Sequence, residues 1–372
     1  MSDDLLKPPL VVGEESAEGF KQPPLAKDPL HFGHVPDKTE LEGANHPRKL
    51  ATGVWGRVGL LFWQGGSKYD AFLVAASAQV GQVMLTLPHA FSQTGLIPGI
   101  VLQIVCAAVS IYTLYMLLIL YLDRKNRMIK DGVWYDADGS GNRTRITSYY
   151  EVVGYLTNKW LAYFSVVVVI ITAVGTCLPQ IISASSNLYI INGSLEKRTW
   201  ALIFGGIMGG SLLIPNFRHM RLFTFFALFA TVFTAFYMII TSGLHMANHG
   251  VSGVGWTRNP VGDLSDWFTG FTTLLFTFGG HYMLMEVLDS MYQPGRFHIH
   301  YAGAYPCIMF LTLPTATIVD WAYPDQIVDA GNAYSVFPRS TVRNASIGLL
   351  VAHTCVAFLL FIMPLYIMNV PL

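Results

Sequence analysis

The sequence predicts an all-α polytopic membrane protein, and three observations lead to this fold class. The 372 residues are 52% hydrophobic and only 12% charged, about half the charge of an average soluble domain. Apolar stretches of about 20 residues, the length a helix needs to cross a bilayer, recur along the chain. Two of them contain helix-breaking residues at mid-length, which is typical of helices that line a cavity. Basic and acidic residues are equal in number, so no basic excess for nucleic acid is present.

Residues 1–52 are predicted to form a disordered cytosolic tail. Prolines stand there among scattered charges, with neither apolar periodicity nor a signal-peptide segment. Residues 53–372 are predicted to form one transmembrane domain, which opens with an interfacial segment at 53–64. The four cysteines lie inside apolar runs without metal-ligand spacing, so neither a disulfide framework nor a metal site is expected.

The first predicted span, 71–95, contains a helix-breaking proline. Pro88 would leave the carbonyl of Met84 without its helical partner, and in hydrocarbon such a carbonyl must find another one. Polar residues at alternating intervals of three and four would lie on one face of this helix. We predict that this broken helix lines a substrate cavity; the alternative is a kinked span with a small-residue packing face. The polar residues are Gln79, Gln82, Thr86, His89 and Gln93.

Seven further apolar runs predict seven further spans, eight in all. Of the 23 lysines and arginines, 18 fall in the tail and in the loops on its side, seven of them in the 123–159 loop. This bias predicts a cytosolic N-terminus. The seven runs are 96–122, 161–191, 199–214, 222–246, 267–291, 301–323 and 347–370.

The third span carries polar residues at steps of four, four, three and four, so one face of a buried helix is predicted to be polar throughout. Amide side chains hydrogen-bond to the carbonyls of their own helix less easily than threonine hydroxyls do, which favours ligand binding here. The fifth span carries threonines alone, and helix packing and pore lining stay equally open for them. The third-span residues are Thr172, Thr176, Gln180, Ser183 and Asn187, and the fifth-span residues are Thr224, Thr231, Thr234 and Thr241.

The sixth span is the counterpart of the first. Phe278-Gly279-Gly280-His281 interrupts it, and each glycine costs ~1 kcal/mol relative to alanine in a helix. Glu286 and Asp289 follow one turn apart. Carboxylates at membrane depth are costly unless paired or protonated, so this pair is a candidate proton carrier; alternatively, both are structural acceptors at the hydrated helix end. His353 in the eighth span ranks below His281, because a lone intramembrane histidine more often donates a hydrogen bond between helices.

Three segments together carry a resemblance to a known family. They are GGSKYDAF with AQVGQVMLTLPHAFSQTG, SASSNLYIINGSLEKRTWALIFG, and FTFGGHYMLMEVLDSMYQP. In order and spacing, from about Gln64 to the C-terminus, they resemble the plant auxin influx carriers, a branch of the amino acid/auxin permease family. The resemblance implies two inverted five-helix repeats whose first and sixth helices are unwound at mid-membrane. Since the family has eleven spans, it also implies a C-terminally truncated carrier with an incomplete second repeat.

The resemblance implies proton-coupled uptake of indole-3-acetic acid or a related aromatic acid across the plasma membrane, driven by the proton gradient without a cofactor. The breaks then fall at Gly81–Thr86 and Phe278–His281, with Glu286 in the family's acidic position. Asp289 resembles general amino acid permeases instead, so a general proton/amino acid symporter stays open. The missing helices leave open a non-transporting receptor or regulatory fragment. An enzyme is not expected, because no nucleophile-base pair, metal-ligand spacing or phosphate loop stands out.

No lysine or arginine lies within the predicted spans, so an anionic substrate would meet the positive N-terminal ends of the half-helices, near Thr86 and Tyr282. The expected partners are a small organic acid or amino acid, protons and the lipid bilayer. The residues predicted to bind the substrate are Gln82, Val83, Met84, Thr86, Gln180, Ser183, Asn187, Phe276, Phe278, Gly279, Gly280 and His281. The residues predicted to carry the coupled proton are Glu286, His281 and Asp289.

Overall fold

The computed structural model describes residues 68–130, 148–212, 220–250, 259–290, 295 and 297–367, and every regular element within them is helical. The predicted all-α fold is confirmed. The predicted tail at 1–52 and the segment 53–64 lie outside the described residues. Among the described residues, five helices are long and apolar enough to cross a bilayer. They are α5 (Leu96–Lys130), α7 (Lys159–Ile191), α9 (Met220–His249), α12 (Phe297–Ala322) and α14 (Thr341–Ile367).

The first predicted span consists of two helices, α3 (Lys68–Val80) and α4 (Val83–Thr94), which meet at an angle of 54°. A break in this span is therefore confirmed, but its predicted cause is wrong, since Pro88 lies inside α4. The chain turns at Gly81 and Gln82 instead, at the start of the Gly81–Thr86 range that the family resemblance implied. Because of the bend, the polar residues predicted for one helical face are divided between two helices with different directions. Gln79 belongs to α3, Gln82 to the turn, and Thr86, His89 and Gln93 to α4.

Close packing explains why the turn falls at Gly81. A Cβ atom at this position would overlap the imidazole ring of His353 on α14. Glycine also favours a helix less than any residue except proline. The sequence pattern could identify the glycine, but not the ring that lies against it.

The sixth span is interrupted as predicted. It consists of α10 (Leu264–Phe276), the 3-10 turn η2 (Gly280–Met283) and α11 (Leu284–Ser290). Gly280 permits a close approach at the break, since a Cβ there would lie 3.0 Å from the Tyr301 hydroxyl and 3.1 Å from the Gln79 amide nitrogen. The two interrupted spans thus meet near their breaks.

The 123–159 segment, predicted as a loop, is partly helical. α5 continues to Lys130, and α6 (Tyr149–Leu156) precedes α7. An ion pair between Arg127 Nε and Asp123 Oδ2, 3.0 Å apart and one turn along, supports the extension of α5. The Arg124 guanidinium lies 3.6 Å from the centre of the Tyr155 ring and so connects the two helices. Polar pairs therefore continue the helix after its apolar pattern ends.

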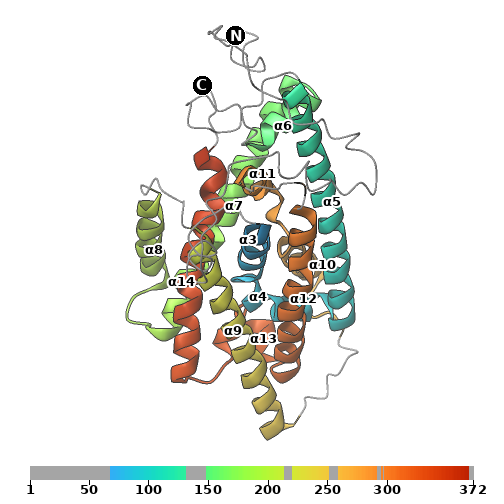
Figure 1. The fold of residues 1–372 in the computed structure, drawn as a ribbon. Coiled ribbons are helices and arrows are strands. Elements are labelled where there is room, and N and C mark those ends of the chain that lie inside the picture. Colours follow the sequence, from blue (N-terminus) through green and yellow to red (C-terminus); the bar gives the residue numbers. More distant parts are fainter. Residues whose placement is uncertain are drawn as a thin grey trace, which may run out of the picture.

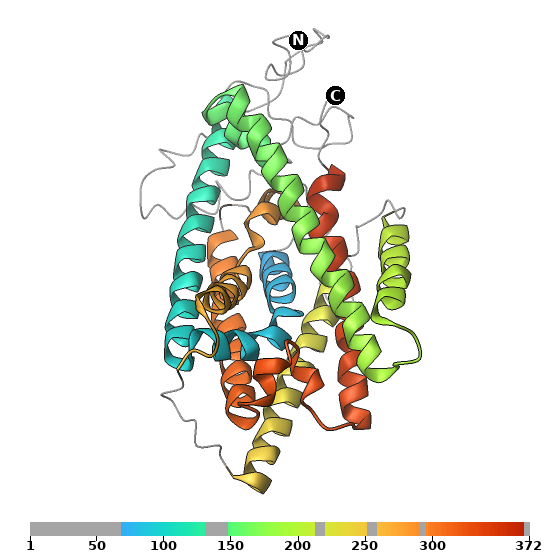
Figure 2. The same ribbon diagram turned by 180° about the vertical axis from the view of Figure 1, so that it is seen from behind.

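The interrupted spans occupy the centre of the molecule. Figures 1 and 2 show α3 and α4 in the middle, with the long helices around them and α8 (Lys197–Ser211) at the edge. α12 packs against α3, α4 and α9, α14 packs against α7 and α9, and α10 packs against α4. The long helices expose large apolar side chains such as Val101, Ile171 and Phe226, as lipid-facing helices do.

The connection between α12 and α14 covers one end of the central helices. It contains α13 (Gln326–Asp329) and η4 (Ala333–Ser335), which both pack against α4. His89 Nδ1 donates to the carbonyl of Ile327 over 2.9 Å. The Asn332 amide donates to Asn187 Oδ1 on α7 over 2.7 Å. The connection is thus fixed to both α4 and α7.

Candidate functional site

A small cavity lies where the two interruptions face α7. Its volume is about 20 Å³, which is room for about one water molecule. Each interrupted span contributes the residues at its turn, and α7 and α14 complete the wall. The lining residues are Ala78, Gln79, Gln82, Val83, Thr176, Gln180, Phe276, Gly279, Gly280 and Phe361.

Three glutamines that line this cavity have unpartnered oxygens. The Oε1 atoms of Gln79, Gln82 and Gln180 are buried and make no hydrogen bond within the described residues. The Gln79 amide nitrogen donates to the Tyr301 hydroxyl over 3.1 Å, so its orientation is fixed. A buried polar atom left unpaired costs about 1–3 kcal/mol, and such atoms usually mark a bound ligand or water. The cavity is therefore suited to a molecule with hydrogen-bonding groups.

Helix ends supply the electrostatics of the cavity. Gln82 precedes α4 and Gly279 precedes η2, and neither end has a side-chain cap. The uncapped N–H groups of a helix start carry partial positive charge and attract anions. Neither acidic nor basic side chains occur among the described lining residues. Since α4 begins at Val83, its positive end lies one turn before the predicted position at Thr86. The Thr86 hydroxyl donates to the Val83 carbonyl over 3.0 Å, within the same helix.

Neighbouring helices hold the second interruption. Ser110 of α5 donates to the Phe278 carbonyl over 3.1 Å, and its hydroxyl lies 2.6 Å from that of Tyr305 on α12. The Phe278 and Tyr305 rings stack with centroids 5.5 Å apart. Sequence reasoning missed Ser110, Tyr301 and Tyr305. Their signal was a polar group inside an apolar run, but nothing in the pattern says which element such a group meets.

Two further contacts attach the interrupted spans to α7 and α14. The Tyr282 hydroxyl lies 2.8 Å from that of Thr176 on α7 and donates to the Phe361 carbonyl on α14 over 3.2 Å. His353 Nε2 donates to the Ser77 carbonyl on α3 over 2.8 Å. His353 thus makes the helix-to-helix hydrogen bond expected for it.

The structure brings part of the predicted site together. Gln82 and Val83 at the first interruption and Gln180 on α7 meet Gly279 and Gly280 in one cavity. Phe276 completes its apolar side. These positions are the ones that combine a helix break with a polar stripe.

Other predicted residues lie elsewhere. Met84 is fully buried in the apolar core, and Phe278 stacks on Tyr305 outside the cavity. Asn187 donates to Ser183 over 3.2 Å and accepts from the α12–α14 connection. His281 lies 2.7 Å from the Thr113 hydroxyl on the exposed side of α5. These side chains do not line the cavity among the described residues, because a helical stripe longer than two turns extends past so small a space. Their predicted contact with the substrate stays a prediction.

Glu286 and Asp289 belong to α11, directly after the second interruption. The structure describes their backbone but not their side chains. Their predicted role in proton coupling thus stays a prediction.

Two interrupted spans meet at a polar cavity inside a bundle of apolar helices, an arrangement that is common among secondary transporters. Residues 64–369 match the model of the family described as transmembrane amino acid transporter protein. The chain belongs to this family.

Curated relatives from plants are similar over most of the chain. Identity is 35% over 331 residues to Auxin transporter-like protein 3 of Medicago truncatula, which is 88% of this chain and 67% of the relative. Identity is 34% over 310 residues to Putative auxin transporter-like protein 4 of Oryza sativa subsp. japonica. These residues are 83% of this chain and 62% of the relative. Identity is 36% over 305 residues to Auxin transporter protein 1 of Arabidopsis thaliana. These residues are 82% of this chain and 60% of the relative. The chain thus spans 60–67% of the length of these relatives.

Proposed function

We propose that this protein takes up indole-3-acetic acid or a related aromatic acid across the plasma membrane together with a proton, with its N-terminus in the cytosol. One observation carries the proposal: three glutamines with unpartnered oxygens line the cavity at which α4 starts without a side-chain cap. The names of the similar plant proteins support the substrate class.

The cavity suits the two ends of such an acid differently. A carboxylate would accept from the N–H groups at the start of α4, where a negative charge is stabilised by about 0.3–1 kcal/mol or more when partly buried. An indole N–H would donate to the amide oxygen of Gln180, and the amide nitrogen of Gln82 would donate to the carboxylate. Phe276 and Phe361 would contact the aromatic ring. Each group of the substrate would thus satisfy one that is otherwise unpaired.

Substrate entry requires movement. An aromatic acid is far larger than a cavity that holds about one water molecule. The turns at Gly81 and Gly279 would have to move away from α7 before the ring could enter. Conformational steps of this kind commonly open and close the sites of transport proteins and enzymes.

Uptake of labelled indole-3-acetic acid into proteoliposomes tests the site. Gln180→Leu and Gln82→Leu should each reduce uptake about tenfold or more, because each removes a hydrogen bond to the substrate. Gln93→Leu is the matched control, since Gln93 on α4 also has a buried unpartnered oxygen but lies outside the cavity. Equal losses in all three variants would contradict the proposed site.

Glu286 is the residue that we propose to carry the coupled proton, because it lies on α11 just past the second interruption. Glu286→Gln fixes a neutral side chain there, so uptake should lose its dependence on an imposed pH gradient. Asp289→Asn provides the comparison one turn away. Uptake by Glu286→Gln that stays pH-dependent and undiminished would exclude this assignment.

A general proton/amino acid symporter is the second candidate, because the matching family is described as amino acid transporters. Amide oxygens can also accept from a substrate ammonium group. Competition decides between the two: a tenfold excess of neutral amino acids should leave uptake of labelled indole-3-acetic acid unchanged. Inhibition by them would favour the amino acid substrate.

A further inference from the structure

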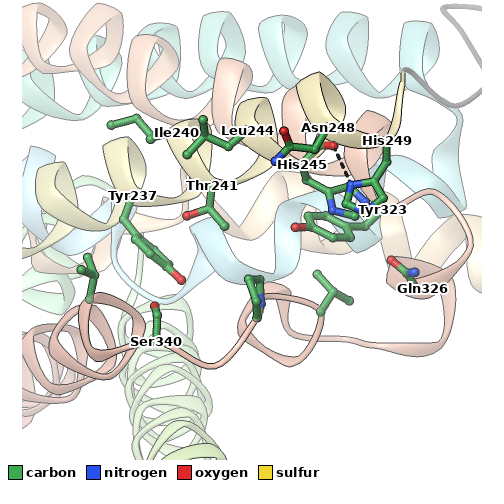
Figure 3. A pocket seen from close by; sticks show the side chains of 13 residues that line it. Tyr237, Ile240, Thr241, Leu244, His245, Asn248, His249, Tyr323, Gln326 and Ser340 are labelled. Carbon is green, nitrogen blue, oxygen red and sulfur yellow. Dashed lines mark hydrogen bonds between the residues drawn. The ribbon is translucent and has the colours of Figure 1, made fainter.

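The two ends of the helix bundle differ in charge. Figure 3 shows a pocket of about 650 Å³ around the C-terminal end of α9, and neither lysine nor arginine occurs among its described lining residues. At the opposite end of the bundle, where α5 ends beside α6 (Figures 1 and 2), α5 carries the partly buried Arg124 and the exposed Arg127. Lysines and arginines next to a membrane helix attract anionic lipid headgroups. The end of α5 therefore has the sign of charge that such a headgroup requires.

The lengths of α5 and α7 bring this end of the bundle to the depth of the lipid headgroups. With 35 and 33 residues, each helix is roughly 50 Å long at 1.5 Å per residue. The hydrocarbon core is about 30 Å thick, so both helices extend beyond it. Trp160, at the start of α7, is 84% exposed, and tryptophan is enriched at the boundary between hydrocarbon and water. Trp160 therefore marks this boundary where α6 packs against α5 and α7.

Two arginines of α5 converge on one aromatic ring of α6. The guanidinium carbons of Arg124 and Arg127 lie 3.6 and 5.9 Å from the centre of the Tyr155 ring. A guanidinium that stacks on a ring uses its flat face, so the N–H groups in its plane stay available. Both arginines can therefore donate to the same phosphate group.

The described residues balance only part of the positive charge at this ring. Asp123 Oδ2 lies 3.0 Å from Arg127 Nε, and the Arg127 side chain is still 54% exposed. The Arg124 guanidinium makes neither an ion pair nor a hydrogen bond within the described part of the chain. Hydrogen bonds between a guanidinium and a phosphate are about twice as strong as neutral ones. Arg124 thus leaves a positive charge that a phosphate group would balance.

An exposed apolar stripe on α7 continues from this site. Large apolar side chains recur there at steps of four, three and four, which places them on one face of the helix. This stripe would contact the acyl chain of a lipid whose headgroup lies at the arginines, whereas a free phosphate ion would not use it. The exposed residues are Trp160, Phe164, Val167 and Ile171.

We propose that the junction of α5, α6 and α7 binds an anionic phospholipid. The lipid phosphate accepts from Arg124 and Arg127, Trp160 packs beside the glycerol backbone, and one acyl chain lies along the α7 stripe. The site is separate from the central cavity, and it does not depend on which molecule the protein transports.

Native mass spectrometry of the purified chain in detergent tests the proposal. Dioleoylphosphatidylglycerol should bind about tenfold more tightly than zwitterionic dioleoylphosphatidylcholine, because two arginines lie at the headgroup. Arg124→Gln combined with Arg127→Gln should remove this preference. Lys197→Gln combined with Arg198→Gln is the matched control at the other end of α7, where Lys197 Nζ lies 5.3 Å from the centre of the Tyr189 ring. Equal binding of the two lipids, or an equal loss in both double variants, would overturn the site.

Two further measurements separate a lipid from a phosphate ion. Trp160→Ala changes a side chain outside the core and should weaken binding of dioleoylphosphatidylglycerol severalfold. An excess of inorganic phosphate of about a hundredfold should displace none of the lipid, because it cannot occupy the apolar stripe. Displacement by phosphate, or unchanged binding in Trp160→Ala, would overturn the lipid as the ligand.

Folding and transport do not affect the interpretation. Arg127→Gln alone changes a half-exposed side chain, so it keeps the fold and should still weaken binding severalfold. Unchanged binding in this variant would contradict the shared phosphate contact. Uptake is not the measurement here, so failure of the transport proposal would leave the lipid result standing.

Discussion

Ser110 shows how much of the site depends on single polar side chains inside apolar helices. Its hydroxyl lies between the Phe278 carbonyl, which the helix break leaves free, and the Tyr305 hydroxyl. All three residues are buried. In hydrocarbon no water is available to replace either contact. The conformation of the second interruption therefore depends on α5 and α12 as well as on its own glycines.

Ser110→Ala should lower the free energy of unfolding by about 1–3 kcal/mol, because it leaves a carbonyl and a hydroxyl unpaired. Denaturant unfolding in detergent micelles measures this change. The control is Ser165→Ala on α7, a buried serine that bonds only to the Ala162 carbonyl of its own helix. A loss no greater than that of Ser165→Ala would show that the contact does not stabilise the break.

Gly81→Ala should destabilise the protein by about 1–3 kcal/mol, the usual cost of overpacking a core. The added methyl group would overlap the His353 ring, whose hydrogen bond to the Ser77 carbonyl limits its movement. Gly348→Ala on α14 is the control, because a Cβ there has no neighbour within 4 Å. Melting temperatures in detergent compare the two variants, and equal shifts would exclude steric overlap at Gly81.

Tyr334 gives a prediction about pH. Burial raises the pKa of its hydroxyl to about 12, although hydrogen bonds to Ser346 and Thr234 oppose the shift. The unfolded chain releases this proton near pH ~10, so the contribution is complete below that pH and is lost as pH rises towards 12. The difference in unfolding free energy between the unsubstituted chain and Tyr334→Phe should stay constant from neutral pH to pH ~9. It should then shrink by about 2 kcal/mol by pH ~12; a constant difference throughout would contradict the shift.

At the scale of the element, apolar length and glycine position predicted most of the fold. The spans at 96–122, 161–191 and 222–246 correspond to α5, α7 and α9, and the break at Gly279 and Gly280 is present. Pro88 does not break the first span, because a helix can continue through proline when its neighbours compensate for the lost hydrogen bond. Where a helix stops depends on packing that local patterns do not contain.

The α12–α14 connection should act as a cover for the central helices. Asn332→Asp removes the donor to Asn187 but keeps the acceptor that binds the Tyr334 N–H. In a background with the four native cysteines replaced by alanine, a cysteine at Ala78 in the cavity should then react several times faster with a water-soluble thiol reagent.

Asn344→Asp introduces the same charge at an exposed position on α14 and is the control for this experiment. An equal labelling rate in both variants would mean that the connection does not limit access to the cavity.

At the scale of the whole molecule, the site could be predicted only in part. Periodicity identified the polar stripes that contain Gln180 and Gln82, and the family resemblance implied a break at Gly81–Thr86. Two of the three cavity glutamines with unpartnered oxygens were thus predicted as site residues. The partners across the fold were not, because Gln79 and Tyr301 are 222 positions apart in the sequence. Which helices meet is decided by packing throughout the bundle, and a single sequence carries no record of it.

Orientation in the membrane is the prediction at this scale. Thr157 and Ser194 lie exposed just beyond the two ends of α7. The excess of lysine and arginine on the side of the tail predicts that Thr157 lies in the cytosol. In intact cells and the cysteine-free background, an impermeant thiol reagent should label Ser194→Cys and should label Thr157→Cys only after permeabilisation. The reverse pattern would place the N-terminus outside.

A broken helix is often expected to bend at its break, yet the second break here is held in place by neighbouring helices. The Phe278 carbonyl and ring are fixed by Ser110 and Tyr305, and Gln79 across the cavity is fixed by Tyr301. Towards α7, the second interruption is joined by the hydrogen bond between the Tyr282 and Thr176 hydroxyls. We expect the cavity to open at that contact, because the hydrogen bonds of Ser110 and Tyr301 then stay intact. The second interruption would then move together with α5 and α12. The groups that contact the substrate would already be oriented when the substrate binds.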